Sequence, residues 1–189
     1  EIPLCLVGSE MCIRDSEIPT ERFIQTRIEA EIAFCMKGSL AGEVTREEVL
    51  QATDYVFPSL EILDTRIFRK DENTGKMRTV FDTISDNAAN AGVISGVQKN
   101  DPQKFDLRRV GSIVMRNNEV EETGLGAGVL NDPITGIIWL VKRLSEYNQK
   151  ISPGEIILSG SFIRPIEARK GDEFYADFGD FGFVECKFN

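Results

Sequence analysis

The sequence predicts an α+β domain in which a mixed, strongly bent β-sheet, roll-like or barrel-like, carries a few flanking helices. Apolar and acidic side chains alternate with a period of two over residues 27–34, which is typical of a strand with one buried face. The same alternation returns over residues 59–63, and signals for helix starts are few. The chain has 189 residues, enough for one domain with one substantial core.

The N-terminal half is predicted to hold a first strand over residues 27–36, then a short helix, then a second strand. Thr45 and Glu48 have the spacing of a capping box, in which each side chain accepts a hydrogen bond from the backbone N–H of the other residue. We expect the helix to end near Asp54 and the second strand to cover residues 59–63.

The middle of the chain is predicted to be a loop followed by a packed helix. Residues 64–80 are rich in charge and contain glycine, which indicates a solvated surface loop, although a loop of this length can also act as a lid. Residues 88–92 have small side chains, which let backbones pack closely. They therefore predict a tight helix against the sheet.

The C-terminal half predicts a hairpin, one long helix and the closing strands. Asn117 and Asn118 suit the positive φ angles of a tight hairpin turn. Asp132 followed by Pro133 marks the start of a helix that should run to about Asn148. Strands are expected at residues 111–116, 120–123, 155–159, 174–178 and 183–188.

The composition excludes several classes of function. The net charge is −9 and no basic block is present, which argues against nucleic acid and anionic membranes as partners. No apolar run is long enough to span a bilayer. The sequence contains no histidine, which removes Ser-His-Asp catalysis and histidine-bound metals. Scattered cysteines without a C-x-x-C pair fit a reduced, cytoplasmic setting.

Residues 1–16 differ in character from the rest of the chain. The stretch from Cys5 to Ser16 is similar to a sequencing adaptor translated in frame. We therefore expect residues 1–16 to be a non-native segment and residues 17–189 to be a single catalytic-type domain. The alternative is a genuine N-terminal arm.

Three glutamates are the candidate metal ligands. Glu29 and Glu31 share one face of the first strand, roughly 7 Å apart, and Glu61 occupies the matching face of the second strand. Such carboxylates repel one another unless water screens them or a cation lies between them. A solvated edge face accounts for the first pair alone. The third carboxylate favours an oxygen site for Mg²⁺, Mn²⁺ or Ca²⁺ that leaves positions for water and a bidentate 2-oxo acid.

Several motifs, in order along the chain, resemble those of the fumarylacetoacetate hydrolase superfamily, within it the branch of 2-oxo-4-enoate hydratases and 4-oxalocrotonate decarboxylases. The resemblance extends from Ser16 to the C-terminus. It implies a fold like the C-terminal domain of that superfamily. The motifs that carry it lie at residues 27–34, 52–61, 80–94, 158–161 and 161–172.

The resemblance implies a metal-dependent hydratase that adds water to a 2-oxo-enedioate, with Mg²⁺ or Mn²⁺ held by Glu29, Glu31 and Glu61. It also implies a homo-oligomer, and it places Ser161 at the substrate. We add Arg164, because a dioate needs a cation for its distal carboxylate. The family's catalytic lysine is expected in an N-terminal region that this sequence lacks. The alternatives are a 4-oxalocrotonate-type decarboxylase and a catalytically incomplete metal-binding fragment or subunit.

Overall fold

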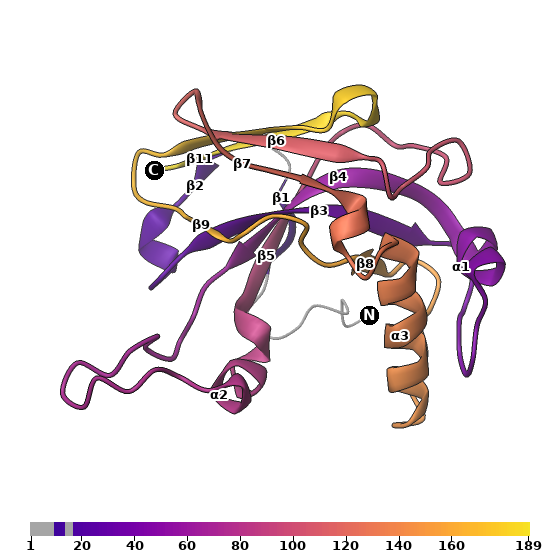
Figure 1. Ribbon diagram of the computed structural model, residues 1–189, viewed down its shortest axis with the longest axis horizontal. Coiled ribbons are helices and arrows are strands. Elements are labelled where there is room, and N and C mark those ends of the chain that lie inside the picture. The colour runs from indigo at the N-terminus through magenta and orange to yellow at the C-terminus, as the bar shows by residue number, and fades with distance from the viewer. Residues whose placement is uncertain (1–9, 14–16) are drawn as a thin grey trace.

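The computed structural model describes residues 10–13 and 17–189, which form two stacked β-sheets with helices at their margins (Figure 1). Sheet A has the strand order β1-β5-β4-β3-β8, and β9 also pairs with β3. Its strands are β1 (Glu10–Ile13), β3 (Arg27–Met36), β4 (Thr53–Leu63), β5 (Asn90–Ser95), β8 (Ile156–Leu158) and β9 (Ile166–Glu167).

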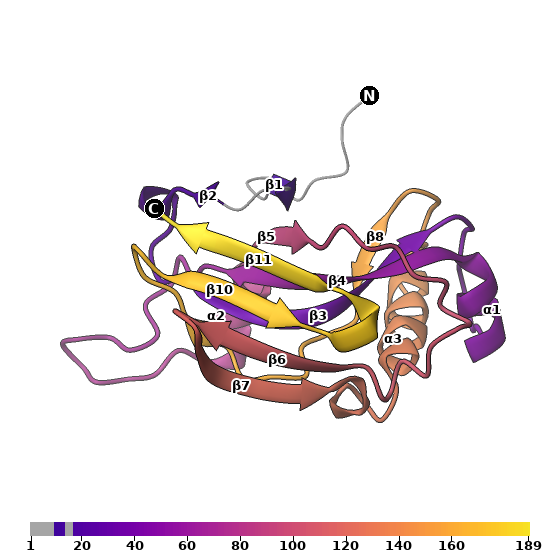
Figure 2. The same ribbon diagram turned by 90° about the horizontal axis from the view of Figure 1, so that it is seen from above.

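Sheet B lies over one face of sheet A and has the strand order β2-β11-β10-β6-β7 (Figure 2). Its strands are β2 (Glu17–Ile18), β6 (Gly111–Arg116), β7 (Glu119–Leu125), β10 (Glu173–Asp177) and β11 (Phe183–Phe188). Both parallel and antiparallel pairs occur, so the predicted mixed α+β architecture is confirmed.

The helices are few, as expected. The α-helices are α1 (Arg46–Ala52), α2 (Val80–Ser85) and α3 (Pro133–Ser145), and the 3-10 turns are η1 (Thr20–Arg22), η2 (Asn87–Ala89), η3 (Gly126–Gly128) and η4 (Gly179–Phe181). In Figure 1, α2 and α3 lie on the side of sheet A that faces away from sheet B. Within residues 10–13 and 17–189, no helix is long and apolar enough to cross a membrane.

The core lies between the two sheets and is built by the alternation read from the sequence. Ile28, Ala30 and Ile32 of β3 are fully buried and belong to one apolar cluster with sheet B residues such as Phe174 and Phe188. The opposite face of β3 therefore points away from the core, and this is the face that carries the acidic residues.

Most predicted elements are confirmed. β3 has the predicted bounds, and Thr45 and Glu48 form the capping box that starts α1. Asn117 and Asn118 have φ angles of 53° and 66° at the turn between β6 and β7. Asp132 caps α3, which begins at Pro133 and ends at Ser145, before the expected Asn148.

The second strand is longer than predicted, because β4 begins at Thr53 and runs through Pro58. The predicted start at residue 59 is therefore wrong. The pairing of β4 with β3 is not interrupted at the proline, since Pro58 lies opposite Ile32 and the preceding Phe57 lies opposite Ala33. A proline usually marks an edge or the end of a strand. Here the long partner strand and the apolar residues before Pro58 extend the ladder.

The predicted tight helix over residues 88–92 is also wrong. These residues form the end of η2 and the start of β5, which pairs with β4 through contacts such as Gly92 opposite Ile62. Small residues suit this position equally well, because β5 is inserted between β4 and β1 in the sheet.

Part of the segment predicted to be non-native takes part in the sheet. β1 pairs with β5 in parallel, with Glu10 opposite Gly92 and Met11 opposite Val93. Residues 1–9 and 14–16 lie outside the described part of the chain. The prediction that residues 1–16 are non-native stays a prediction.

Candidate metal centre

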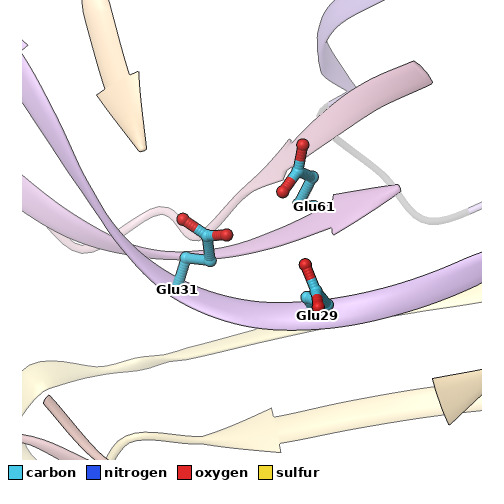
Figure 3. A group of neighbouring side chains, drawn as sticks. All are labelled: Glu29, Glu31 and Glu61. Atoms are coloured by element: carbon cyan, nitrogen blue, oxygen red, sulfur yellow. The ribbon is translucent and has the colours of Figure 1, made fainter. Parts of the chain in front are cut away.

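The three predicted ligands converge at the centre of sheet A. Glu29, Glu31 and Glu61 each offer a carboxylate oxygen, and these oxygens lie within 4.8 Å of one another (Figure 3). Strand register explains the convergence, because Glu29 of β3 lies directly opposite Glu61 of β4. Glu31 is two residues further along β3 and projects from the same face.

The cluster is largely withdrawn from water. Glu31 is only 2% exposed, and Glu29 and Glu61 are half-buried. All three project from the face of sheet A opposite the apolar core, because their neighbours Ile28 and Ile62 point into it. The site is therefore a partly buried acidic cluster on the outer face of the paired strands β3 and β4.

Two uncharged donors hold the carboxylates in place. The backbone N–H of Gly160, just after β8, donates to Oε2 of Glu31 at 2.8 Å. Nδ2 of Asn90, at the start of β5, donates to Oε1 of Glu61 at 2.6 Å. The hydroxyl of Ser59 donates to the backbone carbonyl of Glu31 at 3.0 Å, which ties β4 to β3 beside the cluster.

The electrostatics of the cluster disfavour three negative charges. Burial raises the pKa of Glu29 to about 7, and repulsion from Glu61 adds to the rise while Arg27 opposes it. Burial also raises the pKa of Glu31 well above its usual value, again helped by Glu61, while the Gly160 N–H opposes the rise. A cation between the carboxylates would remove both causes by replacing lost hydration and repulsion with attraction.

The donor set fits a hard divalent cation. All three candidate ligands are carboxylates, the class that Mg²⁺, Mn²⁺ and Ca²⁺ prefer. Among the ion pairs formed by the described residues, none involves Glu29, Glu31 or Glu61. Two neutral donors and the more distant charge of Arg27 leave most of the negative charge uncompensated, and this favours a metal over a structural ion pair.

The two other predicted site residues lie outside this cluster. Ser161 follows Gly160 directly, and its hydroxyl forms a local turn by donating to the carbonyl of Ile163 at 2.9 Å. Arg164 is 86% exposed and its guanidinium pairs with Glu122 of β7 at 2.7 Å. Ser161 is thus adjacent to a residue that contacts the acidic cluster, whereas Arg164 contacts a different carboxylate.

Sequence reasoning missed the two donors, Gly160 and Asn90. A backbone N–H leaves no trace in residue type, although the glycine itself marks an unusual conformation, with φ of +105°. Asn90 sits in the stretch that was read as a helix, and that reading hid the fact that its side chain faces the same way as Glu61. Recognising residues 90–95 as a strand beside β4 would have revealed it.

Two hollows in the described surface lie elsewhere, against sheet B. One, of about 880 Å³, lies along β6 and β7 with Phe162 and Phe178 in its wall, and a smaller one, of about 290 Å³, adjoins β10 and β11. None of the three glutamates lines either hollow. The acidic cluster remains the candidate centre because its chemistry, rather than the depth of a pocket, requires a ligand.

No family model matches the sequence. The chain is 50% identical over 174 residues to 2-oxo-hept-4-ene-1,7-dioate hydratase of Escherichia coli, covering 92% of this chain and 65% of the relative's length. It is 30% identical over 185 residues to 2-keto-4-pentenoate hydratase 1 of Dechloromonas aromatica (strain RCB), covering 97% of this chain and 68% of the relative.

Solved structures agree with these relatives. The 4-oxalocrotonate decarboxylase from Pseudomonas putida G7, complexed with magnesium and adipate, has a TM-score of 0.85 at 29% identity, covering 94% of this chain and 66% of that one. The same enzyme complexed with calcium and acetate also has a TM-score of 0.85, at 28% identity and the same coverage. A fumarylacetoacetate hydrolase family protein from Yersinia pestis CO92 shares the fold, with a TM-score of 0.67 at 16% identity over 92% of this chain and 74% of that one.

Fold and site together define a two-sheet α+β domain with an acidic centre on one sheet. The chain belongs to the fumarylacetoacetate hydrolase superfamily, and within it to the hydratase and decarboxylase branch. The resemblance seen in the sequence motifs is thereby confirmed.

Proposed function

We propose that this chain carries the metal centre of a hydratase of aromatic-compound catabolism. The reaction adds water to 2-oxo-hept-4-ene-1,7-dioate and gives 4-hydroxy-2-oxoheptanedioate. The observation that carries the proposal is the convergence of Glu29, Glu31 and Glu61 in a chain 50% identical to a hydratase of that substrate. The chain spans 65% of that relative's length, so the reaction is proposed for the protein to which this domain belongs.

Glu29, Glu31 and Glu61 would hold Mg²⁺, or Mn²⁺, and would leave positions for water and for the carboxylate and 2-keto oxygen of the substrate. The bound cation would supply the positive charge that polarises the keto group and stabilises enolate character while the double bond moves. The paired strands β3 and β4 would hold the three carboxylates in fixed positions, and these would in turn orient the bound keto acid.

The turn after β8 is the proposed contact for the substrate. The Gly160 N–H bonds to Glu31, and Ser161 is the next residue along the chain, which supports this proposal. The Ser161 hydroxyl bonds only within its own turn among the described contacts, to Ile163, so a small rotation would redirect it toward a substrate oxygen.

Arg164 is the proposed contact for the distal carboxylate, although its guanidinium would have to leave Glu122 to reach it. An Arg164→Ala variant should lose activity on a dioate and keep it on a 2-oxo-enoate with one carboxylate. Equal losses on both substrates would remove Arg164 from the site.

Product analysis tests the reaction itself. The full-length protein to which this domain belongs is incubated with 2-oxo-hept-4-ene-1,7-dioate and Mg²⁺, beside the isolated chain, and the products are followed by NMR and by trapping of CO₂. The hydroxylated dioate without CO₂ is the expected result, with activity lost in a Glu31→Gln variant. The Escherichia coli relative serves as the positive control for the assay.

The same experiment separates the two competing functions. Release of CO₂ from an oxalocrotonate-type substrate would favour the decarboxylase, to whose structure this domain is also similar. Metal binding without turnover would favour the catalytically incomplete metal-binding fragment or subunit. Homo-oligomer formation and a cytoplasmic location stay predictions, and light scattering on the purified chain tests the first.

A further inference from the structure

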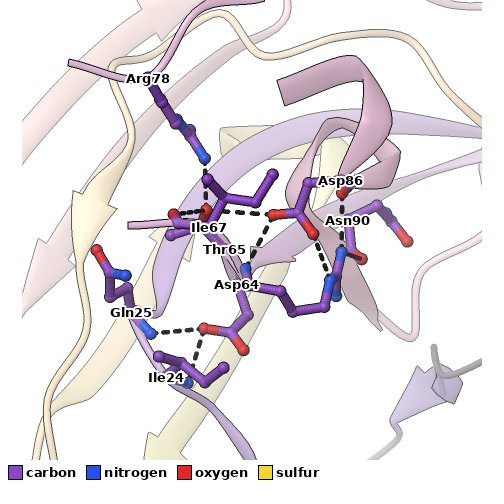
Figure 4. A network of polar contacts seen from close by, with 9 residues as sticks. Ile24, Gln25, Asp64, Thr65, Ile67, Arg78, Asp86 and Asn90 are labelled. Atoms are coloured by element: carbon purple, nitrogen blue, oxygen red, sulfur yellow. Dashed lines mark hydrogen bonds and ion pairs between the residues drawn. The ribbon is translucent and has the colours of Figure 1, made fainter. Parts of the chain in front are cut away.

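A cluster of polar side chains joins the end of β4 to the start of β5 (Figure 4). It ends at Asn90, whose side chain bonds to Glu61 of the acidic centre. We call Thr65, Arg66 and Asp86 the Asp86 knot. The Asp86 carboxylate accepts hydrogen bonds from the Arg66 backbone N–H at 2.9 Å and from Arg66 Nε at 2.6 Å. The Thr65 hydroxyl lies 3.2 Å from the same carboxylate and shares its proton with the Ile67 carbonyl at 2.7 Å. Asp86 is buried, so this carboxylate is fully satisfied by its neighbours rather than by water.

The knot fixes the backbone on both sides of it. Arg66 Nη2 donates to the Asp86 carbonyl at 2.8 Å and approaches the Asn90 carbonyl at 3.5 Å. The backbone N–H of Asp64 donates to the Ala89 carbonyl at 2.7 Å. The end of β4 and the chain entering β5 are therefore bonded together immediately before Asn90.

The chain between Asp86 and Asn90 has an uncommon conformation. Asn87, Ala88 and Ala89 follow one another with φ angles of 52°, 54° and 64°, a left-handed turn that residues with a Cβ rarely adopt. Such strain persists only where neighbouring contacts determine the backbone, and the knot provides them. The turn ends at Asn90, where the register with β4 shifts between Ile62 and Leu63.

The shifted register brings the Asn90 side chain to Glu61, with Nδ2 at 2.6 Å from Oε1. Glu61 lies opposite Glu29 and near Glu31, so repulsion tends to turn its carboxylate away from the cluster. A donor on Oε1 opposes that rotation. Because the donor is neutral, it keeps the negative charge that a lysine would cancel.

We propose that Asn90 is a positioning residue of the metal centre. We further propose that the Asp86 knot fixes the backbone at Asn90 and so keeps its side chain in contact with Glu61. The proposal rests on the proposed metal site and adds a residue that acts on the metal through Glu61. It predicts that loss of the amide lowers metal affinity while the fold stays intact, because the chain reversal is held by the knot.

The first test is Mn²⁺ binding measured by electron paramagnetic resonance in wild type and in an Asn90→Leu variant of similar size. The affinity is expected to fall by about 10-fold to 100-fold, as is typical when the hydrogen-bond partner of a metal ligand is removed. The unfolding temperature of the metal-free variant should remain close to wild type. If Asn90→Leu does not fold, Asn90→Ala provides the same comparison.

A double-mutant cycle tests whether the Asp86 knot acts on metal binding through Asn90. Arg66→Met removes the guanidinium and keeps the alkyl stem, and it should weaken Mn²⁺ binding in wild type but add nothing in the Asn90→Leu background. Arg108→Met is the matched control, because Arg108 forms a similar Nε pair with Asp106 at 2.8 Å, away from the centre. This control should leave Mn²⁺ affinity unchanged.

The outcomes separate the two proposals. Wild type that binds no Mn²⁺ contradicts the metal centre itself. Wild type that binds Mn²⁺, with equal affinity in Asn90→Leu, contradicts the positioning role. Additive losses of Mn²⁺ affinity for Arg66→Met and Asn90→Leu would show that the Asp86 knot does not act through Asn90 and has a purely structural role.

Discussion

The residue with the most informative environment is Glu31, a carboxylate that is 2% exposed and has two acidic neighbours. Burial of an unpaired charge is costly, and such groups usually neutralise or acquire a partner. One N–H from Gly160 is weak compensation for that burial. Ile28, Ala30 and Ile32 pack in the core and keep β3 in register, so Glu31 stays on the face that it shares with Glu29.

The raised pKa values give a pH dependence with a definite sign. The folded, metal-free chain holds more protons than the unfolded chain between pH 4.5 and about 7, because the pKa of Glu29 is raised to about 7. Its stability should therefore fall as pH rises through this window, by on the order of 2 kcal/mol after allowing for partial exposure. Thermal unfolding in a chelator at pH 5.5 and pH 8 measures the change.

Glu31, whose pKa is also raised, acts in the same direction as Glu29. The sequence has no histidine, and the depressed pKa values of Asp86 and Glu167 affect stability only at lower pH. Saturating Mg²⁺ should flatten the slope, since the ion stabilises the ionised carboxylates. A metal-free unfolding temperature that rises from pH 5.5 to pH 8 would contradict this assignment.

For single residues of the centre, the sequence predicts which charged side chains share a face, but it does not predict their hydrogen-bond donors. Glu29, Glu31 and Glu61 were predicted because alternation assigns side chains to faces. The roles of Asn90 and of the Gly160 N–H could not be predicted, because they depend on which strands become neighbours in the sheet.

Among the elements, the β3–β4 ladder and the turn after β8 together build the centre. Ladder register sets Glu29 opposite Glu61, and the turn supplies Gly160 to Glu31. Gly160 has a φ of +105°, which L side chains rarely adopt, while the space around it is ordinary, since an added Cβ would lie 3.4 Å from Val129. The glycine is required by the backbone conformation rather than by crowding.

A Gly160→Ala variant should lose about 1 kcal/mol or more of stability and roughly 10-fold in Mn²⁺ affinity, because the strained turn would shift the N–H away from Glu31. Gly154→Ala is the matched control, with φ of +86° and no atom within 4 Å of the added Cβ. It should cost similar stability and leave the affinity unchanged. Equal affinity losses in both variants would show that the turn acts only through stability.

The left-handed turn before β5 gives a second prediction among the elements. Ala88 is exposed and has φ of 54°, so Ala88→Gly should remove strain and raise the free energy of unfolding by up to about 1 kcal/mol. Ala127→Gly is the control, since Ala127 is exposed in η3 without a positive φ and should lose stability. Chemical denaturation of both variants provides the comparison, and a destabilised Ala88→Gly would exclude strain at this turn.

Helices and turns were predicted correctly where short sequence motifs determine them. Strands were predicted wrongly where their extent depends on pairing with other strands. The capping box of α1 and the Asn117-Asn118 turn are local, and both were predicted. The extension of β4 through Pro58 and the strand at 90–95 depend on pairing with β3, β4 and β1, which no local window contains.

In the whole molecule, the two faces of sheet A have different roles. The face of sheet A that packs on sheet B builds the apolar core, and the other face carries the acidic centre. The predicted bent, mixed sheet is confirmed as a class, whereas the split into two sheets was not predicted. That split follows from sheet order, which period-two patterns do not encode.

The central claim is that the three glutamates hold a divalent cation, and a Mn²⁺ titration of the wild-type chain tests it most directly. The Glu31→Gln variant is measured alongside, with Glu72→Gln as the control, because Glu72 is exposed in the loop after β4. We predict one Mn²⁺ per wild-type chain, an affinity at least about 100-fold lower in Glu31→Gln, and no change in Glu72→Gln. Mn²⁺ binding that is equally tight in Glu31→Gln, or absent from wild type, would contradict the claim.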